Sequence, residues 1–172
     1  MSRKVKNRKE VFKPIVKIGD KSCIVAWDYK PVTKINNKGI EVETPLAIWQ
    51  EESFNFIPTI DFIKEMIYNY YNAMIEEEII CGFEWNGMKV WLTSENQFNY
   101  KSIYDLAIQN ENGILPVTMK FGTTDKPTYY TFKKVDDLRN FYISCINHIQ
   151  TTLKKGWQKK DDINWKNYEL LK

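Results

Sequence analysis

The segment 82–92, GFEWNGMKVWL, constrains the fold more than any other stretch of this chain. Its central Asn-Gly pair favours a type I′ turn, because both central residues of that turn need positive φ. A two-residue turn sets the register and places Trp85 opposite Met88. The segment therefore predicts a β-hairpin with one continuous apolar face. The residues expected on that face are Cys81, Phe83, Trp85, Met88, Val90 and Leu92.

The two tryptophans of this hairpin fall on opposite faces. Trp85 belongs to the apolar face and is expected to pack in a core, because an alternating apolar face of an antiparallel pair usually covers one. Trp91 lies opposite Gly82, on the face that carries the charge pair Glu84 and Lys89. We expect Trp91 either to be half covered by another element or to contact a partner.

Helices are expected on both sides of the hairpin. Thr59 is a suitable N-cap for a helix in which apolar residues recur at steps of three and four. Ser94 and Gln97 fit a capping box and predict a second helix that ends before Gly113. The expected buried stripe of the first helix comprises Ile60, Ile63, Ile67, Tyr70 or Tyr71, and Met74.

A third helix is expected near the C-terminus. Asp136 or Asp137 suits its first turn, and Lys154 and Lys155 suit its last turn, because these charges complement the helix dipole. Gly156 then predicts the end of the helix, since glycine is the usual residue just past a C-cap. The expected buried stripe comprises Leu138, Phe141 or Tyr142, Cys145, Ile149 and Leu153.

Two further strand pairs are predicted from alternating apolar residues and turn signals. Residues 116–121, PVTMKF, and 128–132, TYYTF, read as a second hairpin with a longer loop. Residues 22–29 and 40–49 are also strand-like and are separated by a polar turn region. Pro45 is expected to make the last of these an edge strand or to split it.

Charge is unevenly distributed along this chain of net charge +3. Residues 1–21 hold eight Lys and Arg against Glu10 and Asp20, a balance of +6, whereas residues 41–78 hold nine carboxylates against Lys64, a balance of −8. We interpret residues 1–21 as a basic N-terminal arm that is solvated and poorly ordered. Such an arm could otherwise bind nucleic acid or an acidic surface of a neighbouring copy.

Together these segments predict an α+β fold, with two antiparallel β-hairpins packed with about three helices. The basic arm and an extra strand pair precede them. The predicted division is an arm at 1–21, a strand pair and docking segment at 22–57, and a compact α+β domain at 58–172. A chain of 172 residues is long enough to bury a core without disulfides.

The sequence contains no pattern typical of catalysis. It lacks the glycine-rich phosphate and dinucleotide loops, the zinc-protease helix motif and the serine-hydrolase elbow. His148 follows Cys145 by three residues, but Cys145 belongs to the expected apolar stripe and no oxyanion hole accompanies it. The acidic run 76–78 is interpreted as a solvated helix end, because consecutive helical residues diverge. We therefore expect no enzyme and no catalytic, cofactor-binding or metal-binding residue.

The environment of the protein is predicted from its cysteines and its hydropathy. The three cysteines form no CxxC pair, so we expect buried thiols in a reducing compartment. No stretch approaches 18 consecutive apolar residues, and no apolar segment follows the basic start. We expect a protein made in the cytoplasm without contact to a membrane.

Three segments carry a resemblance to a known family: FEWNGMKVWLT at 83–93, GILPVTMKF at 113–121, and the stretch 129–165 that contains HIQTTLKKGWQKKDDINW. They resemble a small domain of unknown function that recurs in tail and tail-fibre-associated proteins of tailed bacteriophages, and the resemblance covers about residues 79–165. The residues that match its last motif are His148, Gly156, Trp157, Lys160, Asp161 and Trp165. The resemblance implies a fold and no catalytic residues.

The resemblance implies a non-enzymatic structural protein of a tailed phage. We expect a virion component near the tail, the fibre attachment or the head–tail junction, made in the host bacterial cytoplasm. Its partners would be other phage structural proteins, within a homo-oligomer or a larger assembly. The alternatives are a tail-fibre assembly chaperone absent from the virion and a nucleic-acid-binding phage accessory protein, which would use the basic arm. The expected interaction residues are Trp27, Trp49 and Trp91.

Overall fold

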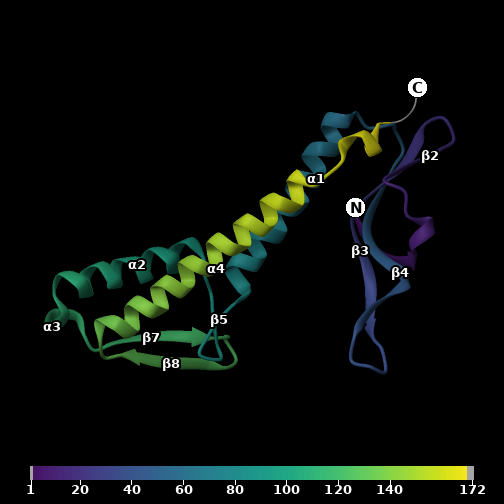
Figure 1. Ribbon diagram of the computed structural model, residues 1–172. Coiled ribbons are helices and arrows are strands. Elements are labelled where there is room, and N and C mark those ends of the chain that lie inside the picture. The colour runs from purple at the N-terminus through teal and green to yellow at the C-terminus, as the bar shows by residue number, and fades with distance from the viewer. Residues whose placement is uncertain (1, 170–172) are drawn as a thin grey trace. The chain divides into compact units, whose positions relative to one another are not determined.

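The computed structural model describes residues 2–169, without the side chains of residues 111 and 112, and these residues form two compact units (Figure 1). The sheet unit comprises residues 2–69 and 163–169, and the helical unit comprises residues 70–162. Residues 1 and 170–172 of the predicted arm and domain lie outside the described part of the chain.

The predicted boundary between residues 57 and 58 is corrected by this division. Residues 58–69 and 163–169 belong with the sheet and not with the helical unit. The Tyr168 hydroxyl donates a hydrogen bond of 3.0 Å to the Ala26 carbonyl, which ties the C-terminal segment to a strand. The short 3₁₀ helix η2, Trp165–Tyr168, places that hydroxyl.

The sheet unit contains one four-stranded antiparallel sheet in the order β1-β4-β3-β2. Its strands are β1 Arg3–Arg8, β2 Ile15–Ile18, β3 Ser22–Ile35 and β4 Glu41–Phe54, with the 3₁₀ helix η1 at Lys9–Val11. The predicted hairpin of β3 and β4 is confirmed and is longer than expected.

The arm predicted at residues 1–21 is wrong within the described residues. Two of its segments form the edge strands of the sheet, since β1 pairs with β4 and β2 pairs with β3. The long β3–β4 hairpin has two open edges whose N–H and C=O groups accept these strands. Val5, the one aliphatic residue of β1, pairs with Trp49 and packs against the sheet core.

Pro45 lies in an interior strand, contrary to the prediction that it would mark an edge or split the strand. It falls between residues 43 and 47, where the β3–β4 register shifts, and one residue beyond the last β1 pair. A proline at such a bulge removes no ladder hydrogen bond. Thr44 Oγ1 donates to the Val32 carbonyl at 2.7 Å and helps to satisfy the irregular backbone.

The core on one face of the sheet is small and includes a buried carboxylate. Ala26, Ala47 and Trp49 form its centre, with Val5 and Phe12 packed against them. Glu51 follows two residues after Trp49 on the same face and is 8% exposed. Its carboxylate accepts hydrogen bonds from Arg3 at 2.9 and 2.6 Å and from the Trp49 indole at 3.2 Å. These charge-assisted bonds offset the desolvation of the buried carboxylate.

The helical unit packs helices on two hairpins, so the predicted α+β class is confirmed. Helix α1 contributes its last residues, from 70 onward, to this unit. The elements are α1 Ile60–Cys81, β5 Phe83–Trp85, β6 Met88–Val90, α2 Ser94–Gln109, α3 Glu111–Ile114, β7 Val117–Gly122, β8 Pro127–Phe132 and α4 Val135–Asp161.

The β5–β6 hairpin has the predicted turn and register. Asn86 and Gly87 have φ values of 50° and 73°, and Trp85 pairs with Met88. The Trp85 ring lies 4.8 Å from that of Tyr130 and 5.1 Å from that of Phe141, measured between centroids. Its predicted place in a core is therefore confirmed.

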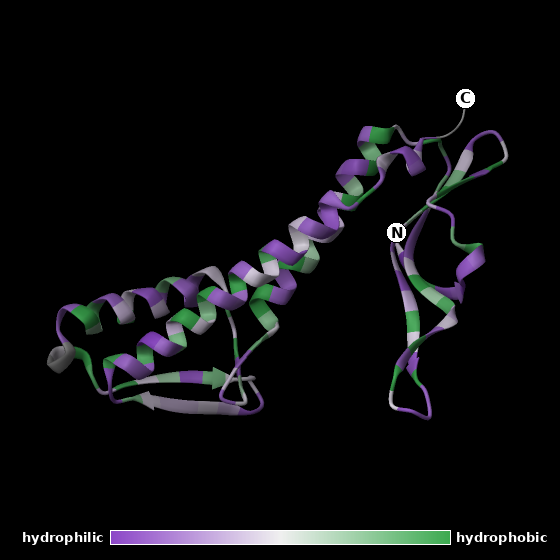
Figure 2. Cartoon of the chain, in the orientation of Figure 1, coloured by the Kyte–Doolittle hydropathy of each residue, from purple (hydrophilic) through white to green (hydrophobic). Residues whose placement is uncertain are grey.

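Helices α2 and α4 cover one face of the β7–β8 hairpin (Figure 1). Five of the eleven buried residues of this core are aromatic. Hydrophobic and hydrophilic residues alternate along α4 (Figure 2). The buried residues of this core are Phe83, Val90, Leu92, Tyr100, Ala107, Met119, Phe121, Phe132, Leu138, Phe141 and Cys145.

Capping matches the prediction for α1 and differs by one residue for α2. Thr59 Oγ1 accepts a hydrogen bond from the Phe62 amide at 3.3 Å, as expected for the N-cap. For α2 the N-cap is Thr93, whose hydroxyl accepts from the Asn96 amide at 3.2 Å. The Gln97 side chain instead donates to the Leu92 carbonyl.

The predicted end of the third helix at Gly156 is wrong. Helix α4 continues to Asp161, and Gly156 is buried against α1. A Cβ at this position would lie 2.2 Å from Cδ1 of Ile75. The glycine costs about 1 kcal/mol of helix propensity, but its missing side chain permits the close approach of α1 and α4.

Candidate interaction surfaces

Two of the three predicted interaction tryptophans are buried. Trp27 is 2% exposed and Trp49 is 4% exposed. The Trp49 ring meets Phe12 at a centroid distance of 5.6 Å, because η1 folds back over the sheet. The prediction that these side chains are presented to a partner is therefore wrong. The sequence placed both residues in strand-like segments, but it did not show that β1 and η1 cover Trp49.

Trp91 is half-buried, as the first of its two predicted alternatives requires. Its indole N–H donates to the Gly122 carbonyl at 2.7 Å, which joins the end of one hairpin to the other. The Lys89 ammonium lies 4.8 Å from the ring centroid, within the range of a cation–π contact. These contacts give Trp91 a structural role, and a further role in partner binding stays a prediction.

Cys145 and His148 are not arranged as a nucleophile and base. Cys145 is 2% exposed, and burial raises the pKa of its thiol to about 12, so the thiolate is scarce near neutral pH. Nε2 of His148 lies 3.0 Å from the Glu78 carbonyl oxygen, to which it donates, and its ring lies 5.2 Å from that of Phe83. The histidine thus joins α4 to α1 and to the first hairpin.

The acidic run 76–78 lies within α1, which continues to Cys81, and its three side chains are exposed. Among residues 2–169, no three His, Cys, Asp or Glu side chains gather in a way that could hold a metal ion. The interpretation of this run as solvated therefore agrees with the structure, although the helix ends later than expected.

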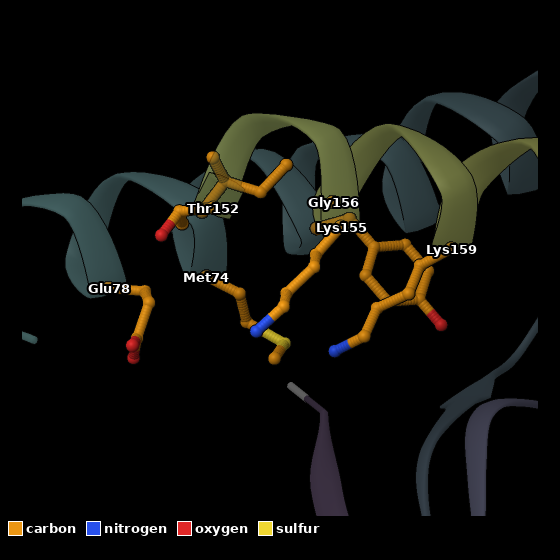
Figure 3. A pocket seen from close by; sticks show the side chains of 8 residues that line it. Met74, Glu78, Thr152, Lys155, Gly156 and Lys159 are labelled. Carbon is orange, nitrogen blue, oxygen red and sulfur yellow. The ribbon is translucent and has the colours of Figure 1, made fainter. Parts of the chain in front are cut away.

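A shallow groove of about 220 Å³ lies between α1 and α4. Figure 3 shows the amino groups of Lys155 and Lys159 and the carboxylate of Glu78 extending to the same side of the two helices. Two ammonium groups one helical turn apart can hold a carboxylate or phosphate group. Glu78, however, borders the same groove and supplies a negative charge from within the chain.

Three of the eight basic residues expected in an arm, Arg3, Arg8 and Lys9, form ion pairs, and the other five are exposed. Arg3 binds Glu51, and Lys9 pairs with Glu43. Lys4 and Lys6 are exposed on the strand face opposite Val5. The nucleic-acid alternative stays a prediction, with fewer free charges than the sequence count suggested.

An exposed cluster of three phenylalanines marks the sheet unit. Phe54, Phe56 and Phe62 have centroid separations of 5.4, 5.7 and 5.7 Å. Phe56 is 45% exposed and Phe62 is 42% exposed, and the adjacent Ile57 is 37% exposed. Apolar side chains that gather at a surface are typical of protein-binding sites. We call this group the phenylalanine cluster.

A second apolar surface runs along α4 in the helical unit. Ile143, Ile146 and Trp157 are 47%, 38% and 52% exposed, and Leu153 lies between them half-buried. These residues face away from Phe141 and Cys145, which build the core. We call them, together with Gln150, the α4 stripe.

Neither surface was identified from the sequence alone. The stripe residues recur at steps of three and four, which is a readable signal. It was missed because the helix was expected to end at Gly156 and because Leu153 was assigned to the buried face. The phenylalanine cluster combines the end of β4 with the start of α1. Neither the period of a strand nor that of a helix predicts it, because its residues lie in different elements.

Comparison with known protein families, with curated proteins and with solved structures finds no match for this chain. The resemblance of residues 79–165 to a phage domain stays a prediction. Within residues 2–169, no helix combines the length and the apolar character needed to cross a membrane.

Proposed function

We propose that this chain is a non-enzymatic structural protein of a tailed phage. It is a virion component near the tail, the fibre attachment or the head–tail junction, and it acts through contacts with other phage structural proteins. The phenylalanine cluster carries the proposal of protein–protein contacts. The resemblance of residues 79–165 supports the phage assignment.

The phenylalanine cluster has the chemistry of a binding hot spot. Burial of apolar surface stabilises a complex by about 25 cal/mol per Å², and aromatic residues are enriched at the centres of interfaces. The rings of Phe54, Phe56 and Phe62 already hold one another edge to face. A partner that covers them therefore orders few additional side chains, which lowers the entropic cost of binding.

The first test is quantitative peptide mass spectrometry on purified phage particles and on the infected-cell lysate. We expect peptides from residues 102–120 and 140–154 in particles, at a constant ratio to the portal protein. Abundance in the lysate together with absence from particles would overturn the virion role and favour the assembly chaperone.

The second test addresses the cluster itself. Phages that carry Phe56→Ser and Phe62→Ser together should incorporate the protein much less, while the isolated chain keeps its helix content by circular dichroism. The matched control is Tyr129→Ser, since Tyr129 is 66% exposed in the helical unit. Equal incorporation of the double variant and the control would show that the cluster is not the contact surface.

A further inference from the structure

The long β3–β4 hairpin extends beyond both edge strands of the sheet. On β4 the pairing with β1 ends at Leu46, and on β3 the pairing with β2 ends at Val25. We call the two-stranded segment beyond them, residues 33–43, the hairpin tip. It carries Ile35 and Ile40, which are 75% and 57% exposed and are the two most exposed aliphatic side chains of the described sheet unit. The core of the unit therefore makes little use of them.

The hairpin tip is held in one conformation by its own hydrogen bonds. The Asn36 amide donates to the Ile40 carbonyl at 2.9 Å. Asn36 Oδ1 accepts from the amides of Lys38 and Ile40 at 2.8 and 3.1 Å, and Gly39 has the positive φ of 74° that the turn requires. A partner that covers the tip therefore finds an ordered backbone, which lowers the entropic cost of binding.

The hairpin tip and the phenylalanine cluster lie at opposite ends of the same sheet. Ile35 pairs with Glu41 at one end of the β3–β4 ladder, and Cys23 pairs with Phe54 at the other. Figure 1 shows the β3–β4 loop at the end of the sheet away from β2. The twelve positions from Cys23 to Ile35 span about 40 Å at the rise of a β-strand. The tip therefore cannot reach the cluster of its own chain.

We infer that copies of this chain associate head to tail, with the hairpin tip of one copy on the phenylalanine cluster of the next. Ile35 and Ile40 then cover the exposed rings of Phe56 and Phe62, and both surfaces remove apolar side chains from water. The two surfaces differ, so the contact is heterologous and leaves one tip and one cluster unused at the ends of a chain of copies. Such a contact generates a ring or an open filament.

The hairpin tip has a net positive charge. Lys34 and Lys38 are exposed, and neither forms an ion pair within residues 2–169. Of the two carboxylates of the tip, Glu43 pairs with Lys9 of η1. Since that pair is neutral, Lys34, Lys38 and Glu41 leave a balance of +1 at the tip.

The helix start beside the phenylalanine cluster has the opposite charge. Asp61 and Glu65 are exposed, and Lys64 pairs with Asp61 at 3.8 Å. Since residues three apart on a helix share a face, Glu65 lies beside Phe62. These three charges leave a balance of −1 next to the cluster. The charges of the two surfaces therefore favour their contact, which should weaken as salt screens them.

This inference rests on the proposed function in one respect, because both use the phenylalanine cluster as a contact surface. It goes further in naming the partner, a second copy of this chain. The two can fail separately. Association of the isolated protein without incorporation into particles would overturn the virion role alone. A protein that stays monomeric, together with reduced incorporation of the Phe56→Ser, Phe62→Ser variant, would overturn the head-to-tail contact and assign the cluster to another phage protein.

Sedimentation velocity of the full chain tests the head-to-tail contact. At about 100 µM, the wild type should sediment as species of two or more 20.5 kDa chains. Two double variants each remove one surface: Ile35→Ser with Ile40→Ser alters the tip, and Phe56→Ser with Phe62→Ser alters the cluster. Each should weaken association by more than about 30-fold, because apolar burial is lost, and should sediment as a monomer.

A mixture of the two double variants distinguishes this contact from any other. The mixture supplies one intact cluster and one intact tip per pair of chains, so it should form a dimer and nothing larger. Formation of that dimer also shows that both variants are folded. The matched control is Ile143→Ser with Ile146→Ser, two exposed isoleucines of the α4 stripe, which should sediment like the wild type.

A monomeric wild type at this concentration would overturn the inference. Unchanged association in either double variant would do the same, as would a mixture that stays monomeric while circular dichroism shows both variants folded. Loss of association in the α4 control would move the contact to the helical unit and would also overturn the head-to-tail arrangement.

Discussion

The two units of this protein are stabilised in different ways. The helical unit has a continuous core of eleven buried residues, most of them aromatic or aliphatic, between two hairpins and two long helices. On one face of its sheet, the sheet unit has a core of three buried residues and a buried Glu51 that is bound to Arg3. Elsewhere in this unit Val25, Ile63 and Ile67 are also buried, and the two edge strands are held by pairing with β3 and β4.

This difference indicates where each unit is vulnerable. Hydrophobic burial is spread over many side chains in the helical unit, so its stability depends on packing volume. The sheet unit also buries apolar side chains, on both faces of its sheet, and it depends in addition on the satisfaction of one buried charge. Because the units differ in this way, we do not expect a single two-state transition for the whole chain.

The largest expected effect is that of Phe141→Ala. Phe141 is fully buried, and its ring lies 5.1 Å from Tyr100 and 5.3 Å from Phe132. Its removal should destabilise the helical unit by about 3–5 kcal/mol. Hydrogen exchange followed by mass spectrometry should show faster exchange in peptides of residues 70–162 only. Tyr129→Ala is the control and should cost less than about 0.5 kcal/mol; equal effects would contradict the core assignment.

Trp49→Ala should have the next largest effect, in the other unit. The side chain is 4% exposed and packs on Phe12, so the loss should lie near about 3 kcal/mol. The same exchange measurement should show the change in peptides of residues 3–54. Ile35→Ala, at a 75% exposed position of β3, is the control. If Trp49→Ala exchanges like the wild type, Trp49 does not stabilise the sheet core and is again a candidate for partner contact.

Arg3→Ala should have a smaller effect, because the Arg3 side chain is 72% exposed. Among the side chains of residues 2–169, its removal leaves the Trp49 indole as the donor to the Glu51 carboxylate, and we expect a loss of about 1 kcal/mol. Urea unfolding followed by tryptophan fluorescence measures it. Arg8→Ala is matched in strand and exposure, and its nearest carboxylate lies 3.9 Å away. If both variants shift the midpoint equally, Glu51 does not depend on Arg3.

The smallest expected effect is a difference in reactivity between two buried thiols, one in each unit. Burial raises the pKa of Cys23 and of Cys145, the latter to about 12, so neither should react with iodoacetamide at pH 8 in the folded protein. With increasing urea, peptide mapping should detect modified Cys23 before modified Cys145, because the sheet unit depends on edge-strand pairing and on one buried charge. Modification in the reverse order would contradict the comparison of the two units.

The raised pKa of Cys145 also sets the direction in which the stability of the helical unit depends on pH. The folded pKa of Cys145, about 12, exceeds its ordinary value of 9.0. Its contribution to stability is therefore complete below pH 9 and is lost as the pH rises toward 12. The midpoint of unfolding of the helical unit should therefore decrease as the pH rises from 9 to about 12. It should decrease less in Cys145→Ala.

The features predicted correctly are local. Asn86 and Gly87 specified their turn through their tolerance of positive φ, and Thr59 specified a helix start through its hydroxyl. The alternation of apolar residues placed Trp85 in a core. Each of these outcomes depends on residues within a few positions of one another, so a single sequence contains the information.

The features predicted wrongly depend on distant segments. Whether β1 is an arm or a strand depends on the open edge of β4, more than thirty residues away. Glycine is typical just past the end of a helix, yet Gly156 lies inside α4, where its missing side chain leaves room for Ile75 of α1. The candidate surfaces were missed for the same reason, since the exposed face of α4 is defined by what α1, α2 and the hairpins leave uncovered.

By itself, the sequence determined the α+β class, the turn of the first hairpin and the periodicity of its helices, because turn chemistry and side-chain period act over short distances. The tertiary structure decided which strands complete the sheet, that Trp49 lies inside, and that the α4 stripe lies outside. Burial is a property of packed neighbours, and neighbours from distant parts of the chain are assigned only when the units fold.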